Sequence, residues 1–139
     1  MQRIFGLCLC LGLLYLVTAD ELEEVKEQIE KAVRENAGSD ELAEKIISKG
    51  KILLDCASKN PEGVALLRKI TLPVAAEGTK CAATKSDISD PAERELAGKQ
   101  CFRDASIRAK EAAGLTEKEN VAYDEVKVCI LTNLHEVKV

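Results

Sequence analysis

Apolar residues recur every three or four positions along most of the chain, and this spacing predicts α-helices. Ala, Glu, Lys and Leu, which favour helices, dominate the chain from Asp20 onward, whereas Val and Ile do not alternate as they do in strands. The first predicted helix spans 20–36, and one of its faces carries the apolar side chains Leu22, Val25, Ile29, Ala32 and Val33. The pattern indicates an all-α fold.

Turn and cap residues divide the rest of the chain into further helices. A second predicted helix spans 40–57, and Asn60-Pro61 starts a third that spans 61–71. Leu72-Pro73 predicts a break, because the residue before a proline avoids the helical conformation. We therefore expect a loop over 75–88, where the apolar pattern is weak.

Two capping signatures mark the last two helices. Asp90-Pro91 opens a predicted helix over 91–113, which Gly114 ends. Thr116 and Glu119 form the spacing of a capping box at the start of a helix over 117–134. The expected fold is a small bundle of about five helices.

The first 19 residues have the pattern of a secretory signal peptide. Arg3 is followed by an apolar run over 4–17 and by small residues that end at Ala19. That run is shorter than the roughly 20 residues that span a bilayer. We expect cleavage after Ala19, no membrane span, and a single secreted, extracellular domain over 20–139.

The cysteines fall into two groups. Two lie in the predicted signal peptide, and we expect the remaining four to form two disulfides, as is common in small secreted domains. These four are Cys56, Cys81, Cys101 and Cys129. Zinc sites use closely spaced cysteines with histidine nearby, and His135 is the only histidine, so no metal site is predicted.

Helix geometry predicts which cysteines are joined. If the last two helices form an antiparallel hairpin around Leu115, Cys101 and Cys129 lie at equal distances from the turn and face each other. Alanines near Cys101 allow the close helix approach that a disulfide needs. This predicts the pairs Cys101–Cys129 and Cys56–Cys81.

The sequence lacks the residue patterns of common catalytic and nucleic-acid sites. His135 is the only histidine, and no nucleophile, phosphate-loop or metalloprotease motif occurs, so no catalytic residue, enzyme activity or cofactor is predicted. The formal net charge is −4 and no basic run is present, which disfavours nucleic-acid binding.

Three non-enzymatic functions remain. The favoured one is interaction with an extracellular protein, as in venom, salivary or body-fluid effectors. The alternatives are a carrier that holds a small apolar ligand between helices, and a structural or extracellular-matrix component. The one candidate partner site is a small basic patch formed by Lys51, Lys59, Arg68 and Lys69.

Overall fold

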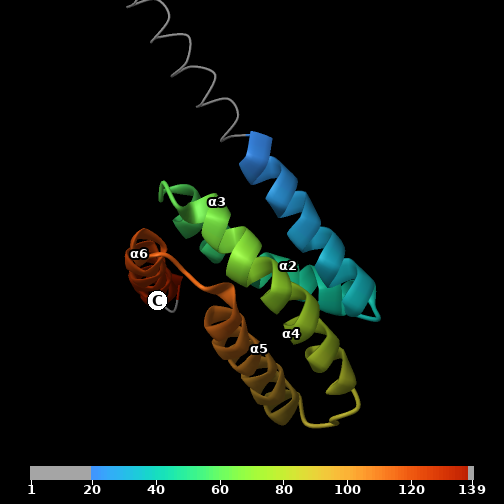
Figure 1. The fold of residues 1–139 in the computed structure, drawn as a ribbon. Helices are drawn as coiled ribbons and strands as arrows, with labels where there is room; N and C mark the ends of the chain where they lie inside the picture. Colours follow the sequence, from blue (N-terminus) through green and yellow to red (C-terminus); the bar gives the residue numbers. More distant parts are fainter. Residues whose placement is uncertain (1–19, 138–139) are drawn as a thin grey trace, which may run out of the picture.

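Residues 20–137 of the protein form an all-α bundle of five helical segments (Figure 1). Two disulfides within this range link its helices. The computed structural model describes residues 20–137, with side chains to Asn133; the predicted signal peptide, its cleavage point and the His135 side chain lie outside this range. The first helix covers residues 20–36. The other elements are α2 (Asp40–Ser58), α3 (Gly63–Leu66), η1 (Leu67–Thr71), α4 (Leu72–Thr84), α5 (Pro91–Ala113) and α6 (Glu117–Val137).

Most helix boundaries follow from the turn residues in the sequence. Gly38 and Gly114 have φ values of 76° and 56°, which glycine adopts at little cost. Ser39 caps α2 by accepting a hydrogen bond from the Leu42 N–H at 3.3 Å, and Asp90 caps α5 through the Ala92 N–H at 3.1 Å. The predicted starts of α2 and α5 are confirmed.

The first helix supplies the centre of the main core. Val25, Ile29 and Val33 are buried, and they pack in one cluster with α2 and the start of α4. These residues repeat every four positions, so they form one stripe on the helix. The apolar face predicted from the sequence is therefore the face that the bundle buries.

The predicted break at Leu72-Pro73 is wrong, because the chain stays helical from Gly63 to Thr84. A proline inside an α-helix removes one hydrogen bond and its ring collides with the carbonyl four residues earlier. Here the preceding turn, η1, is a π-helix in which the Leu72 N–H donates to the Leu67 carbonyl. This wider turn gives the ring of Pro73 room, and the predicted loop over 75–88 is instead helix α4 followed by a short turn.

Helix α4 packs antiparallel to α5 along much of its length (Figure 1). Cys101, Ala105 and Ala109 of α5 are buried, and they recur every four residues. Gly78 of α4 lies against the ring of Phe102, where a Cβ atom would overlap the ring. Small residues thus allow the close contact between these helices.

The predicted hairpin of the last two helices is also wrong. After Gly114 the chain turns away from α5, and α6 packs against α2 and α3 instead (Figure 1). Ala122 of α6 joins Leu66, Ile70 and Ala109 in a second core cluster. The physical reason is that α4 and η1 already cover most of the buried stripe of α5, and α6 reaches that stripe near its end, at Ala109.

The disulfide pairing predicted from the hairpin is therefore incorrect. The bonds are Cys56–Cys129, which joins α2 to α6, and Cys81–Cys101, which joins α4 to α5. Their Cα–Cα distances are 5.8 Å and 5.7 Å, within the usual range. Each bond connects two helices that are packed together, and the predicted pairs Cys101–Cys129 and Cys56–Cys81 do not form.

Candidate ligand cavity

A cavity of about 450 Å³ lies between the helices of the bundle. Its walls come from the first helix, α2, α4 and α5, with Ile130 of α6 contributing as well. Pockets that bind small molecules usually have volumes of about 300–1,000 Å³ and apolar walls. The cavity falls within this range, and it is partly open to solvent.

The walls of the cavity are aliphatic. Branched side chains of α2 face it across from α4 and α5, and Phe102 is the one aromatic residue among those that line it. The principal apolar lining residues are Ile29, Val33, Leu42, Ile46, Leu53, Val74 and Ala82. Water gains few hydrogen bonds in such a space, so an apolar molecule binds there more favourably than water does.

The charged residues that line the cavity are mainly basic, and because all but Glu30 are exposed to solvent, we call their position the mouth of the cavity. Four cationic and two acidic residues line it, so that the local charge is positive although the chain as a whole carries −4. The cationic residues are Lys45, Lys49, Arg94 and Lys99, and the acidic ones are Glu30 and Glu95. The cavity therefore has an apolar interior and a cationic edge.

An ion pair at this mouth connects α2 to α5. The Lys49 Nζ donates to Glu95 Oε1 at 3.1 Å, and about half of each side chain is exposed. The hydrogen bond from Lys49 is the main reason that the pKa of Glu95 lies below its ordinary value, and the charges of Lys49, Lys99 and Lys45 lower it further. The pKa of Glu95 therefore reports a cationic environment built by two facing helices.

Two glycines line the cavity from opposite helices. Gly50 lies within α2 and Gly98 within α5, and a Cβ built on either residue meets no heavy atom within 4 Å. Glycine in a helix interior costs about 1 kcal/mol relative to alanine. Alanine would fit at both positions, so packing does not require these glycines, whereas they keep the cavity wide.

The residues of the predicted basic patch do not line the cavity. Arg68 lies 3.9 Å from Glu24 of the first helix, and Lys69 donates to Glu119 at 2.8 Å. Lys51 and Lys59 are exposed at the middle and the end of α2. The structure thus gives two of the four predicted residues a partner within the bundle.

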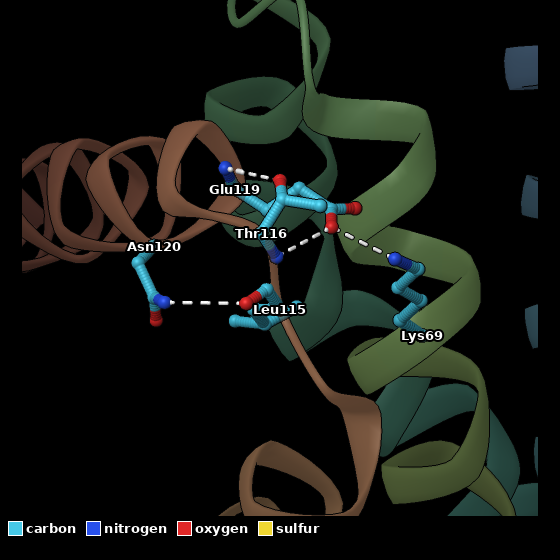
Figure 2. A network of polar contacts seen from close by, with 5 residues as sticks. All are labelled: Lys69, Leu115, Thr116, Glu119 and Asn120. Atoms are coloured by element: carbon cyan, nitrogen blue, oxygen red, sulfur yellow. Dashed lines mark hydrogen bonds and ion pairs between the residues drawn. The ribbon is translucent and has the colours of Figure 1, made fainter.

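The contact of Lys69 is part of a buried cap at the start of α6 (Figure 2). Glu119 accepts from the Thr116 N–H at 3.0 Å, and Thr116 Oγ1 accepts from the Glu119 N–H at 3.2 Å, which is the predicted capping box. Glu119 is only 4% exposed. Its pKa is lowered first by the hydrogen bond from Lys69 and then by the bond from the Thr116 backbone.

From the sequence, a ligand pocket between helices is expected only under the alternative carrier function, and no residue is assigned to it, although the sequence contains signals for its position. Gly50 and Gly98 interrupt two otherwise strong helix patterns, and Lys45 and Lys49 stand four positions apart on one helix face. What the sequence could not reveal was that α4 exists and holds α5 opposite α2. When α4 is not predicted, nothing in the sequence indicates that the cavity residues of α2 and those of α5 lie opposite each other.

Comparison with known proteins places no further constraint on the site, since no protein-family model, no curated protein and no solved structure matches this chain. Within residues 20–137, no cluster of three or more His, Cys, Asp or Glu side chains is arranged to hold a metal ion. No helix in that range has the length and apolar character needed to cross a membrane.

Proposed function

We propose that this protein is a non-enzymatic carrier that holds a small apolar ligand in the cavity between its helices. The observation that carries the proposal is the aliphatic cavity of about 450 Å³, which has the size and lining of a ligand site. The sequence favours protein interaction over the carrier, because aromatic residues are scarce and the abundance of alanine indicates closely packed helices. The geometry favours the carrier, because aliphatic side chains alone form the greater part of the cavity wall.

The two disulfides support the role of an extracellular carrier. Cys81–Cys101 joins α4 to α5, and the residues next to these cysteines, Ala82 and Phe102, both line the cavity. Because this disulfide links α4 to α5, the wall that they form should keep its shape when no ligand is bound. Disulfides persist in oxidising compartments, and together with the predicted signal peptide they support secretion.

A displacement assay with a fluorescent apolar dye tests this proposal. Wild-type protein should bind the dye saturably at micromolar concentration, and apolar ligands should displace it. Gly98→Phe, which places a ring at the mouth, should weaken binding at least about tenfold, or by roughly 1.4 kcal/mol. Gly98→Ala is the matched control and should bind as the wild type does, since a Cβ has room there. Absence of saturable binding by the wild type would refute the carrier.

A specific observation also favours the second candidate, interaction with an extracellular protein. Val121, Val128 and Leu131 lie along one side of α6, and each is at least half exposed. Apolar side chains grouped on a surface often mark contact with a partner. Charge introduced at Val128 should abolish a partner interaction and leave dye binding unchanged, so the two functions can be separated.

A further inference from the structure

We infer that the ligand is an amphiphile with a single carboxylate at the end of an apolar chain, as in a fatty acid. This inference rests on the proposed carrier function and adds the chemistry of the polar end. The apolar walls select the chain, and the cations around the mouth select the charge of the headgroup.

The cations at the mouth come in pairs from two facing helices. Lys45 and Lys49 are four residues apart on α2, so they point to the same side of that helix. Arg94 and Lys99 lie on α5, on the other side of the opening. A ligand whose chain enters the cavity leaves its headgroup between these two sets of side chains.

Glu95 shows that this place accommodates a carboxylate. Its side chain projects from α5 to Lys49 of α2, and the charges of Lys45 and Lys99 also act on it. The two acidic residues leave a cationic excess at the mouth, because four cationic residues lie there as well. A further carboxylate, supplied by the ligand, would offset part of that excess.

The charge of the mouth also contrasts with the rest of the chain. A protein with a net charge of −4 repels anions at long range, so a cationic mouth attracts them only locally. Hydrogen bonds to charged groups are stronger than neutral ones, and they should favour the carboxylate over a neutral headgroup by about tenfold in affinity.

Ligands that share one chain and differ in the headgroup provide the test. Laurate, dodecanol and dodecylamine would each compete with the fluorescent dye on the protein that comprises residues 20–139. We expect laurate to bind about tenfold more tightly than dodecanol, and dodecylamine to bind most weakly. Equal affinities for laurate and dodecanol, or tighter binding of dodecylamine, would overturn the inference and leave the carrier function standing.

Variants at the mouth then locate the headgroup. Lys45→Gln combined with Lys99→Gln should reduce laurate affinity about tenfold and leave dodecanol affinity unchanged. The control pair, Lys51→Gln with Lys118→Gln, removes the same charge from exposed residues that do not line the cavity and should have little effect.

The most specific variant is Glu95→Gln, which removes the competing carboxylate and frees Lys49. It should raise laurate affinity severalfold without changing dodecanol affinity. If Glu95→Gln leaves laurate binding unchanged or weakens it, the headgroup does not lie among these cations and the inference fails. If neither dye nor laurate nor dodecanol binds to the wild type, the carrier function and the inference fail together.

Discussion

At the scale of single residues, Glu119 shows how one side chain can fix the position of a helix. It completes the capping box of α6 and binds Lys69 of η1, so that the start of α6 is attached to a helix more than 40 positions earlier in sequence (Figure 2). The prediction of the capping box from Thr116 and Glu119 is confirmed. The partner Lys69 could not be predicted, because it depends on how the helices pack.

This network predicts a pH-dependent stability. The pKa of Glu119 is lowered in the folded protein, so its contribution is complete above the unfolded value of about 4.3 and disappears as pH falls through the folded pKa. Lys69→Met should therefore be less stable than the wild type near neutral pH, and the difference should narrow below about pH 4. Urea unfolding of both proteins measures this difference.

Lys118→Met is the control for that experiment, because Lys118 is an exposed lysine one position from Glu119. Lys118→Met should change the free energy of unfolding only slightly, and by the same amount at all pH values. The contrary result is a difference in free energy of unfolding between the wild type and Lys69→Met that stays constant down to about pH 3. That result would show that the ion pair does not act on Glu119.

Gly63 provides a second prediction at this scale. A Cβ at Gly63 would overlap the backbone carbonyl of Ala57, which cannot move without distorting the end of α2. Gly63→Ala should lower the free energy of unfolding by about 1–3 kcal/mol, the usual cost of overpacking. Gly50→Ala, where the same atom meets open space, should instead stabilise by up to about 1 kcal/mol. Denaturant unfolding of both variants tests the contrast, and equal destabilisation would refute it.

At the scale of elements, α4 decides the topology of the molecule. The sequence suggests a loop because Pro73 and Gly78 both disfavour helix, but the structure accommodates both residues within a helix. The π turn of η1 gives the proline ring room, and Gly78 allows Phe102 to approach. Both solutions depend on tertiary contacts, which local sequence patterns do not describe.

The error in the disulfide pairing follows from the missing helix. Periodicity places Ala97, Ala105, Ala109 and Ala112 on the face of Cys101. Ala105 and Ala109 are buried, whereas Ala97 is partly buried and Ala112 is exposed. With α4 interpreted as a loop, α6 was the nearest helix to cover that face. The buried face of α5 was thus predictable from periodicity, whereas the helix that covers it was not.

The two disulfides should contribute unequally to stability. Cys56–Cys129 joins residues 73 positions apart and Cys81–Cys101 joins residues 20 apart. In the chain-entropy model these loops correspond to about 4 and about 3 kcal/mol. Unfolding of the double variants C56S/C129S and C81S/C101S should show the larger loss for the first.

Mass spectrometry of a non-reducing digest tests the pairing directly. The expected products are one peptide pair linked through Cys56 and Cys129 and another linked through Cys81 and Cys101. A linked pair that contains Cys56 and Cys81 would contradict the packing of α6 against α2.

At the scale of the whole molecule, the cavity is a consequence of the way the helices are distributed. α5 is held by α4 and α6 by α2, so α5 stands opposite α2 without packing against it along its length. The all-α class, the helix caps and the apolar face of the first helix could all be predicted from local patterns. The cavity could not, because it lies between elements whose arrangement depends on long-range contacts.

The most direct test of the carrier is to locate a bound ligand by methyl NMR. On addition of laurate, the largest chemical-shift changes should fall on methyl groups that line the cavity, such as those of Ile46, Leu53, Val74 and Ala82. The exposed methyl groups of Val128 and Leu131 on α6 should change little. Changes that instead concentrate on Val128 and Leu131, with the cavity methyl groups unaffected, would contradict the account and place binding on the surface of α6.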